Sequence, residues 1–418
     1  MQVWLDTLGC RLNEAELESW TTQLLAAGHT LALQPEDAGL MVLNSCAVTQ
    51  DAVRKSRAMT RQLQRGNPSA KLVLSGCYAT LHGDEAAALG VDLVLHNQHK
   101  HDFMTQIQPL LEDPAQPMFA TEPAEQPHLA MGRQRAFVKV QDGCRYRCSF
   151  CVVTLARGDE RSQPLAQLVT EVQQLADSGL RECVLTGVHL GGYGSDIGSE
   201  LGTLVRTLLA ETSIQRLRLG SLEPWDLPED FWSLFADGRL MPHLHLPMQS
   251  GSDSVLRRMA RRCHSAEFMA LAAEARRQVP DIHLSTDIMV GFPGETDAEF
   301  QETCAFVEAV EFGDVHLFSY SRRPGTRAAS MPAQVHGAVQ RERMLRLKAV
   351  VSHSRARVMA RHLGKKVEVL WENPRQGRST GYTPHYFRVY SDTLQASSSV
   401  SSIRLSAISE AGDAFIGI

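Results

Sequence analysis

Short apolar runs that end in a cysteine recur three times in the first hundred residues. The runs are VWLDTLG before Cys10, LMVLNS before Cys46 and KLVLSG before Cys77, and a helix-like or loop-like segment follows each. Such runs are typical of buried strands, and strands that alternate with helical patterns are typical of a parallel sheet with crossover helices. The pattern predicts an N-terminal parallel α/β domain.

The same alternation resumes between Phe137 and Ser321. Candidate strands cover residues 137–140, 182–187, 215–221, 243–246, 282–291 and 314–320. Candidate helices include residues 165–178, 200–211, 228–236, 253–262, 265–278 and 297–310. Six strand–helix units are too few for a complete eight-stranded barrel. We therefore expect a central partial (βα)6 barrel or an open parallel sheet.

Three segments break this alternation. Residues 108–136 contain five prolines and little periodicity, which predicts a linker or wrapping segment. Residues 337–362 have the pattern of a long basic helix. Beyond Leu363 the candidate strands are short and are separated by Gly, Pro and Ser, which predicts a small all-β barrel. Those strands lie in residues 365–373, 379–390 and 401–409, and the serine-rich run 397–402 is interpreted as a loop.

Length and composition place the chain among ordinary globular proteins. It has 418 residues, 43% of them apolar and 21% charged, which favours two to three folded domains and argues against disorder as the main state. It contains no apolar run of about 18 residues, and it lacks a basic start. We therefore expect neither a membrane span nor a secretory signal, and a cytoplasmic location.

The net charge of −5 hides an asymmetry along the chain. Between His316 and Arg378 there are 14 lysines and arginines against three acids, a formal charge of +11, and the rest of the chain carries −16. A basic segment on an acidic body suggests a polyanionic partner that binds one face. The alternative is a solvated helix followed by a linker.

The nine cysteines favour metal binding or catalysis over disulfides, because their number is odd and no secretion signal precedes them. Cys144, Cys148 and Cys151 follow the strand FVKV within one short loop. Three thiolates can hold three irons of a cubane 4Fe-4S cluster and leave the fourth iron open for a small molecule. The alternative, a zinc site, usually needs four ligands, and no fourth cysteine or histidine lies close by in sequence.

Cys10, Cys46 and Cys77 form a second candidate set. Each follows a predicted strand, and the carboxyl ends of parallel strands share one edge of a sheet, where ligands usually bind. Three thiolates gathered there could hold a second cluster with one open iron. The alternative is three buried cysteines that act as small apolar residues, which is also how we interpret Cys183, Cys263 and Cys304.

The CxxxCxxC spacing, with Phe150 directly before the last cysteine, resembles the radical S-adenosylmethionine (SAM) superfamily. The resemblance implies that the cluster passes one electron to SAM, that the sulfonium bond breaks and that a 5′-deoxyadenosyl radical forms. That radical removes hydrogen from an unactivated carbon. In such enzymes the cofactor performs the difficult step, and the protein positions it and excludes water.

Further motifs make the resemblance more specific. The segments TLGCRLN, NSCAVT and SGCY resemble the N-terminal domain of the methylthiotransferase family. The family's later motifs are matched by RGDERS, LTGVHLGGYG, HLPMQSGSDSVLRRM, STDIMVGFPGET and FSYSRRPGTRAA, so the resemblance spans essentially the whole chain. It implies a methylthiotransferase domain over residues 1–125, a radical SAM domain with a closing basic helix over 130–362, and an RNA-binding TRAM domain over 363–418.

The resemblance also implies a substrate type and partners. Three types are known in the family: two act on isopentenyladenosine or N6-threonylcarbamoyladenosine beside the tRNA anticodon, and one acts on an aspartate of a ribosomal protein. NSCAVT, SGCYA, LTGVHLGGYG and GYTPHYFRV are most similar to the N6-threonylcarbamoyladenosine type. The expected cofactors are SAM and two 4Fe-4S clusters. The expected partners are tRNA and a reducing protein such as flavodoxin or ferredoxin, and the expected state is a monomer.

In this scheme the open iron of the N-terminal cluster holds sulfide or persulfide, one SAM methylates that sulfur, and a second SAM supplies the radical that acts at C-2 of adenine. The resemblance implies a SAM pocket that includes Phe150, Gly191, Gly192, Gln249, Ser250, Gly251 and Gly291. A glycine-rich turn after a strand is otherwise a tight connection. Candidate substrate residues are Arg157, Arg161, Arg341, Arg343, Tyr382 and Tyr386, although arginines can equally form ion pairs.

Two other classes of function remain open at this point. A two-cluster electron carrier would need no SAM pocket, and an RNA-binding protein could use its clusters only for structure. The histidines, tryptophans and methionines show no ligand spacing in the sequence and are given no role. Formation of 5′-deoxyadenosine from SAM and a reductant would separate the enzyme from both.

Overall fold

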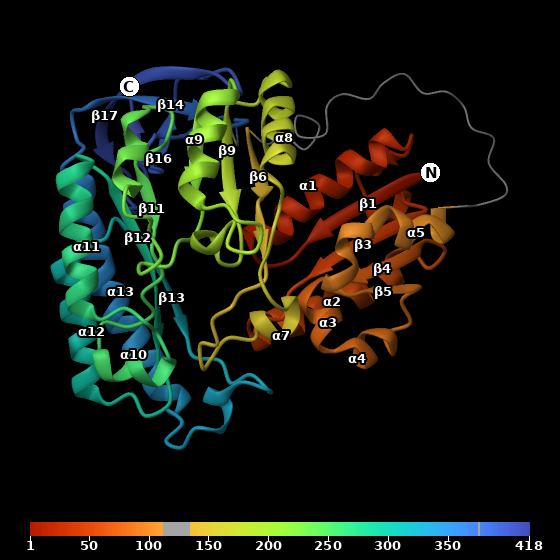
Figure 1. The fold of residues 1–418 in the computed structure, drawn as a ribbon, viewed down its shortest axis with the longest axis horizontal. Helices are drawn as coiled ribbons and strands as arrows, with labels where there is room; N and C mark the ends of the chain where they lie inside the picture. The colour runs from red at the N-terminus through yellow and green to blue at the C-terminus, as the bar shows by residue number, and fades with distance from the viewer. Residues whose placement is uncertain (112–133, 375–376) are drawn as a thin grey trace. The chain divides into compact units, whose positions relative to one another are not determined.

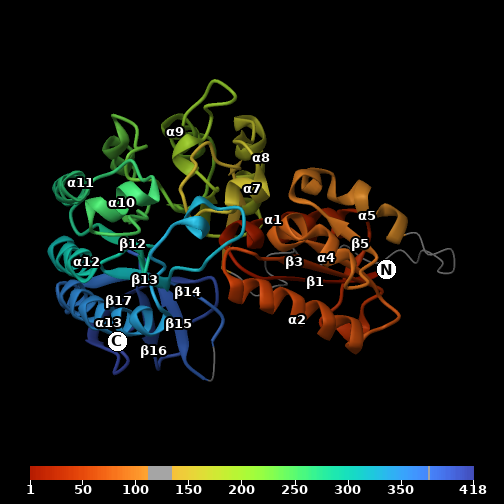
Figure 2. The same cartoon turned by 90° about the horizontal axis from the view of Figure 1, so that it is seen from below.

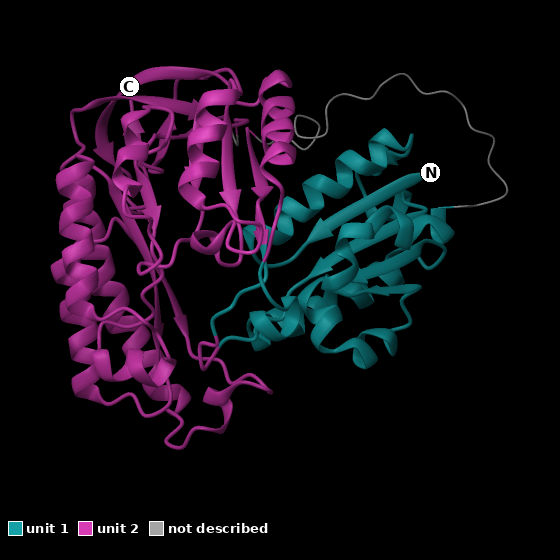
Figure 3. Cartoon of the chain, in the orientation of Figure 1, with its two compact units in different colours: residues 1–131, 142–146, 151–160 teal, residues 132–141, 147–150, 161–418 magenta. Residues whose placement is uncertain are grey.

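A computed structural model describes residues 1–111, 134–374 and 377–418. Its chain divides into two compact units, shown in Figure 3. The first unit comprises Met1–Met131, Asp142–Tyr146 and Cys151–Glu160, and the second comprises Gly132–Gln141, Arg147–Phe150 and Arg161–Ile418. Most of the linker predicted at 108–136 lies outside the described residues.

The first unit is built on a five-stranded parallel sheet in the order β2-β1-β3-β4-β5 (Figure 1). Its strands are β1 (Gln2–Thr7), β2 (Thr30–Leu31), β3 (Leu40–Ser45), β4 (Lys71–Ser75) and β5 (Leu93–Leu95). Its helices are α1 (Arg11–Ala26), α2 (Gln50–Gly66), α3 (Gly76–Leu81), α4 (Gly83–Ala87), α5 (Phe103–Leu111) and α7 (Val153–Arg157), with 3-10 turns η1 (Pro35–Asp37) and η2 (Asn97–Asp102). The predicted parallel α/β arrangement is confirmed.

The central strand β3 explains why this sheet is buried on both faces. Leu40 and Val42 lie in the core that also contains Trp20 and Phe103, whereas Met41 and Leu43 lie in a separate core on the other face. A strand buried on both sides is apolar at every position, which is why LMVL lacks the usual alternation. The polar residues of β3 are therefore left at its carboxyl end, next to Cys46.

The second unit contains six parallel strands in chain order. β6 (Arg135–Lys139), β9 (Glu182–Thr186) and β10 (Arg216–Leu219) form one sheet, and β11 (His243–His245), β12 (His283–Val290) and β13 (Asp314–Ser319) form another. A parallel bridge between Ser221 and His245 joins the two sheets. This succession confirms the predicted partial (βα)6 barrel. Short strands β7 (Gln141–Asp142) and β8 (Arg161–Ser162) flank the cysteine loop.

Helices cover one face of these strands (Figure 2). They are α8 (Leu165–Asp177), α9 (Leu201–Glu211), α10 (Asp253–Met259), α11 (Ser265–Gln278), α12 (Asp297–Val310) and α13 (Gly337–Ala360), with 3-10 turns η3 (Leu190–Gly192), η4 (Phe231–Ala236) and η5 (Arg327–Ser330). Leu244, Leu284, Ile288 and Leu317 face this layer and belong to its core. Because strand side chains alternate, polar residues such as Asp287 occupy the opposite face.

The C-terminal residues form a closed five-stranded barrel in the order β14-β15-β16-β18-β17, as predicted. Its strands are β14 (Lys366–Trp371), β15 (Ser379–Tyr382), β16 (Arg388–Ser391), β17 (Val400–Ile408) and β18 (Phe415–Gly417). The prediction of a loop at 397–402 is wrong for its second half, because β17 begins at Val400. There Ser401 Oγ accepts a 2.7 Å hydrogen bond from Trp371 Nε1, which gives a serine a defined place in the strand.

No helix within the described ranges is long and apolar enough to cross a membrane.

Candidate functional site

The three N-terminal cysteines lie at the carboxyl ends of three adjacent strands. Cys10 caps the start of α1 after β1, Cys46 directly follows β3, and Cys77 lies in the first turn of α3 after β4. The thiols of Cys10 and Cys77 both act electrostatically on Cys46, so the three side chains share one neighbourhood. The structure therefore brings together the second candidate set, as the strand pattern predicts.

Two glycines allow the backbone to pass close to these thiols. Gly9 has φ +112°, and a Cβ there would lie 2.7 Å from Cys46 Sγ. Gly76 has φ +98°, and a Cβ there would lie 2.1 Å from the Ser45 carbonyl oxygen. Both positions need the left-handed region, which is costly for other residues, and both lack room for a side chain. The residue before Cys10 and the residue before Cys77 must therefore be glycine, because the backbone passes too close to its neighbours for a side chain.

Polar and positively charged groups surround the same cysteines. Asn97 Nδ2 donates to Cys77 Sγ at 3.7 Å, and the charge of Arg157 acts on all three thiols. Burial raises the pKa of the Cys46 thiol to about 11. Cluster thiolates need nearby donors and positive charge to balance their negative charge. These residues therefore fit a 4Fe-4S cluster held by Cys10, Cys46 and Cys77.

Arg157 lies at the centre of a buried ion network behind these cysteines. Its side chain is 1% exposed, and Nη1 lies 2.9 Å from Glu16 Oε1 and 3.0 Å from Asp142 Oδ1. Nη2 donates to Asn13 Oδ1 at 2.8 Å. Lys100 pairs with the same Glu16 from η2. The substrate role that the resemblance implies for Arg157 stays a prediction, and the structure shows its guanidinium buried against three acceptors.

Replacing Arg157 with alanine is expected to destabilise the first unit by about 3–5 kcal/mol, because Glu16 and Asp142 would lose a buried charge partner. Hydrogen–deuterium exchange should rise in peptides that cover α1 and α7, the helices that Arg157 joins. The matched control, Arg61→Ala, removes an exposed arginine from α2 of the same unit and should leave exchange unchanged. Equal exchange in both variants would show that the network contributes little.

The second set of cysteines lies in the loop before α7. The backbone N–H groups of Tyr146 and Val153 each donate to a cysteine sulfur at 3.4 Å, the first to Cys144 and the second to Cys151. In the second unit, Arg261 Nη1 donates to Cys148 Sγ at 3.8 Å. Donors to each sulfur are what a reducible cluster requires. The loop residues therefore fit the predicted 4Fe-4S site.

The segment between the last two cysteines is anchored to the second unit. Ser149 N–H donates to the Met259 carbonyl oxygen at 2.9 Å, and Ser149 Oγ donates to that of Arg258 at 2.9 Å. Phe150 packs against a core that includes Met259, Phe292 and Tyr320. These contacts hold the loop by its backbone, by one hydroxyl group and by one ring, and none of them uses a cysteine sulfur.

The residues predicted to line a SAM pocket fall into two groups. A Cβ on Gly251 would lie 2.4 Å from Phe306, and one on Gly291 would lie 2.4 Å from Gln340, so close packing against α12 and α13 explains both glycines. Ser250 Oγ contacts Thr303 Oγ1 at 3.1 Å, also on α12. Gln249 differs, because it is buried at φ +80° and its Oε1 has no partner within the described structure. It remains the best SAM candidate of the four.

Gly191 and Gly192 end the 3-10 turn η3 after β9. A Cβ on Gly191 would lie 3.0 Å from Cβ of Asp226. Asp226 Oδ2 in turn lies 2.6 Å from Nε2 of the fully buried His189. This His–Asp pair could not be predicted from the sequence, because 37 residues separate its members. The turn therefore brings a backbone glycine pair and a buried histidine to the carboxyl end of β9.

The predicted substrate arginines of the second unit differ in burial. Arg161 and Arg341 are exposed, whereas Arg343 is buried and pairs with Glu295 and Asp297, both at 2.8 Å. Arg343 therefore joins the first half of α13 to Glu295 in the loop before α12 and to Asp297, the first residue of α12.

The two predicted tyrosines lie where the barrel meets the parallel strands of the same unit. Tyr386 Oη accepts from Arg135 at 3.0 Å, and its ring lies 4.5 Å from the Arg218 guanidinium carbon. Tyr382 is half-buried between Arg135 and Arg388. Tyr386 thus joins the barrel to the parallel strands, and Tyr382 is only partly exposed.

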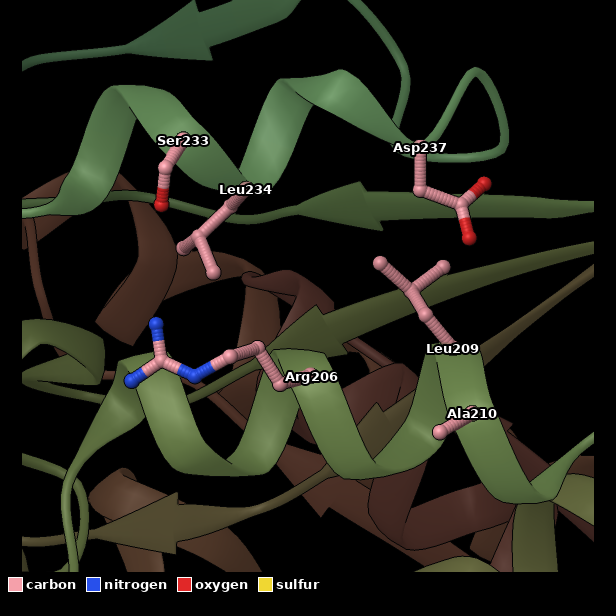
Figure 4. Close-up of a pocket in the computed structure, with 6 residues that line it drawn as sticks. All are labelled: Arg206, Leu209, Ala210, Ser233, Leu234 and Asp237. Atoms are coloured by element: carbon pink, nitrogen blue, oxygen red, sulfur yellow. The ribbon is translucent and has the colours of Figure 1, made fainter.

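A pocket of about 240 Å³ lies in the second unit (Figure 4). It opens between α9 and η4 in the outer helical layer and contains none of the predicted site residues. Its lining residues are Arg206, Leu209, Ala210, Ser233, Leu234 and Asp237.

Comparison with known proteins supports the cysteine-based interpretation. The family model of the radical SAM superfamily matches residues 138–307, and that of the uncharacterized protein family UPF0004 matches residues 2–96. The radical SAM methyltransferase TsrM from Kitasatospora setae has a TM-score of 0.59 at 17% identity, over 78% of this chain and 77% of that chain. This likeness shows the fold alone.

Curated relatives cover most of the chain. The threonylcarbamoyladenosine tRNA methylthiotransferase MtaB of Thermotoga maritima is 37% identical over 92% of this chain and 90% of its own length. The tRNA-2-methylthio-N(6)-dimethylallyladenosine synthase of Novosphingobium aromaticivorans is 37% identical over 90% and 87%. MtaB of Bacillus subtilis is 33% identical over 92% and 88%. The chain therefore belongs to the radical SAM methylthiotransferase family, as an enzyme that transfers sulfur-containing groups and uses SAM and a 4Fe-4S cluster.

Proposed function

We propose that this enzyme converts N6-threonylcarbamoyladenosine to its 2-methylthio derivative at position 37 of tRNA, next to the anticodon. Relatives of two substrate types reach the same 37% identity, so identity does not separate them. The observation that favours this type is the set of motifs NSCAVT, SGCYA, LTGVHLGGYG and GYTPHYFRV. Two of these motifs surround Cys46 and Cys77, and one forms the turn after β9.

We assign the second cluster to Cys10, Cys46 and Cys77, and the sulfur that enters the product to this site. The support is the gathering of three thiols at one sheet edge with Asn97 and Arg157 beside them. Bound SAM and the reduced radical cluster supply a 5′-deoxyadenosyl radical for hydrogen removal. The chain's part is to hold two sets of thiolates and to exclude water. We also propose a flavodoxin- or ferredoxin-like electron donor and a monomeric enzyme.

We propose that the closed barrel is a TRAM domain and that the outer face of β15 and β16 binds RNA. Tyr382 and Tyr390 project from this face, Arg388 reaches both hydroxyl groups, and the Arg378 guanidinium carbon lies 5.2 Å from the Tyr390 ring centre. Aromatic rings stack on unpaired bases and arginines contact phosphates. Tyr390 and Arg378 were not among the residues predicted from the sequence.

The basic helix α13 is a weaker candidate for this role. Arg346 pairs with Glu342, Arg355 with Asp314, and both Arg357 and Arg361 with Glu311. Met344, Val350 and Val351 pack against the central core together with Leu347. The competing interpretation of this helix, a packed helix with solvated arginines, therefore describes most of its length.

Replacing Arg378 and Arg388 with alanine is expected to weaken tRNA binding and to flatten its salt dependence by about 1.4 units in the log–log slope, at about 0.7 per phosphate on a single strand. Filter binding at salt concentrations of about 50 to 200 mM measures the tRNA affinity and its salt dependence. The control combines Arg346→Ala on α13 with Arg361→Ala, directly after that helix, and should keep the wild-type slope. If instead the variant of Arg346 and Arg361 flattens the slope and the variant of Arg378 and Arg388 does not, α13 is the RNA-binding element.

Nucleoside mass spectrometry of tRNA tests the reaction itself. In cells that lack this protein, 2-methylthio-N6-threonylcarbamoyladenosine should be absent, and it should return with the wild-type gene. Return of the 2-methylthio derivative of isopentenyladenosine would assign the enzyme to the other tRNA type. Unchanged tRNA together with loss of a methylthio group from a ribosomal protein would move the substrate to protein.

A further inference from the structure

Three polar side chains from neighbouring strands of the second unit meet on the face opposite the helical layer. His245 ends β11, Asp287 lies in the middle of β12, and His316 lies in β13. Asp287 is the direct partner of His316 in the parallel register, and His245 is the partner of Ser285, two residues before Asp287. Because this register is fixed by the backbone ladders, the three side chains are held on a rigid surface.

Two of their three separations are close to those of ligands around one metal ion. His245 Nε2 and His316 Nδ1 each lie 3.2 Å from Asp287 Oδ1. One ligand atom from each residue lies within 4.8 Å of the other two. Bonds of about 2.0–2.1 Å to nitrogen and oxygen in a tetrahedral zinc site give ligand–ligand edges of about 3.3–3.4 Å. The two nitrogen–oxygen separations are already close to that edge length.

The surroundings orient the His245 ring as they do in known metal sites. His245 Nδ1 lies 3.0 Å from Ser285 Oγ, which leaves Nε2 directed at Asp287. A histidine ligand usually bonds through its second ring nitrogen to a group that fixes ring orientation. Ser285 is itself buried and its hydroxyl also contacts His243 Nε2 at 3.1 Å. Ser285 is thus placed as a supporting residue for His245.

Exposure is graded across the three residues. The side chains of His245 and Asp287 are 15% and 24% exposed, whereas that of His316 is 62% exposed. Of the three residues, His316 is therefore the one most open to solvent, and an ion would enter from its side. Three protein ligands with one open position are typical of sites that bind an exchangeable water or oxygen ligand.

We propose that His245, Asp287 and His316 form a binding site for one divalent transition-metal ion, with zinc as the best match to two imidazoles and one carboxylate. The site uses none of the six cluster cysteines and lies entirely within the second unit. It does not depend on which nucleoside the enzyme modifies. The competing interpretation is a hydrogen-bonded triad in which Asp287 accepts from both rings.

Equilibrium dialysis of the untagged, full-length enzyme with both clusters in place tests the proposal. After dialysis against micromolar zinc, elemental analysis should find one zinc per chain in the wild type, with unchanged iron. Asp287→Asn and His316→Gln should each lose that zinc. The second variant changes an exposed residue, so it keeps the test valid if the first fails to fold. Ser285→Ala should weaken zinc binding by about 10–100-fold, the usual cost of losing such support.

The chain provides a matched control for these variants. His264 and Asp253 form another histidine–aspartate pair of the second unit, with 3.6 Å between Nδ1 and Oδ2. The variant His264→Ala should retain the zinc. If wild type, Asp287→Asn and His316→Gln take up equal zinc, the triad is a hydrogen-bonded network and the proposal is wrong.

Discussion

Replacing Cys144, Cys148 and Cys151 with alanine is expected to lower the iron content of the reconstituted enzyme from about eight to about four per chain and to abolish SAM cleavage. Each of these sulfur atoms accepts a hydrogen bond from a backbone N–H or from Arg261, as a cluster thiolate would. Without the cluster no electron reaches the sulfonium. Iron analysis and chromatography of 5′-deoxyadenosine measure the two effects separately.

The control removes the same number of thiols from outside the two candidate sites. Cys183, Cys263 and Cys304 lie in or against the core of the second unit. Their combined replacement by alanine should keep about eight irons and keep SAM cleavage. A loop variant that retains its full iron content would contradict the assignment of the radical cluster, whatever its activity.

The order of strands and helices in the second unit could be predicted from the sequence because each strand is a short apolar run followed by an amphipathic helix. The expected strand at 182–187 is β9 at Glu182–Thr186, and the expected helix at 265–278 is α11 at Ser265–Gln278. Buried parallel strands carry this signal strongly. The C-terminal barrel gave a weaker signal, and its last strand, Phe415–Gly417, was not predicted.

Side-chain roles were harder to predict than elements, since they depend on contacts between distant residues. The six cluster cysteines could be predicted because three of them lie within one short loop and each of the other three follows a predicted strand. The contacts of Arg157 could not be predicted, because its partners Glu16 and Asn13 lie more than a hundred residues earlier in the chain. His245, Asp287 and His316 are far apart in the sequence and form no motif there. The register of three neighbouring strands brings them together.

The charge pattern of the sequence and the contacts in the structure favour different elements for RNA binding. The +11 segment suggested that α13 binds a polyanion. In the structure the acids that neutralise its arginines, such as Glu295 and Glu311, come from other segments of the second unit. Formal charge counted along the sequence therefore overstates the free positive charge of this helix. We propose the surface of β15 and β16 because its arginines lie beside aromatic rings, and Arg378 and Arg388 are also paired there, with Asp392 and Asp413.

Replacing Cys10, Cys46 and Cys77 with alanine is expected to separate the two halves of the reaction. The variant should keep about four irons and still cleave SAM to 5′-deoxyadenosine, because the loop cysteines are intact. It should form no methylthio product, since these thiols hold the site that we assign to the transferred sulfur. Liquid chromatography–mass spectrometry of tRNA nucleosides and of SAM products from one reaction measures both outcomes together.

A finer variant tests the same site without removing its ligands. Gly9→Ala places a methyl group 2.7 Å from Cys46 Sγ in a backbone conformation that favours glycine, so it should disturb the three thiols together. We expect it to reproduce the phenotype of the triple variant: intact SAM cleavage, less iron and little methylthio product. Gly28→Ala is the matched control, because Gly28 also has positive φ in the first unit, at +84°, but open space around it.

Normal product from the triple variant would contradict sulfur insertion at this edge, because no other gathering of three cysteines exists among the described residues of the first unit outside the radical loop.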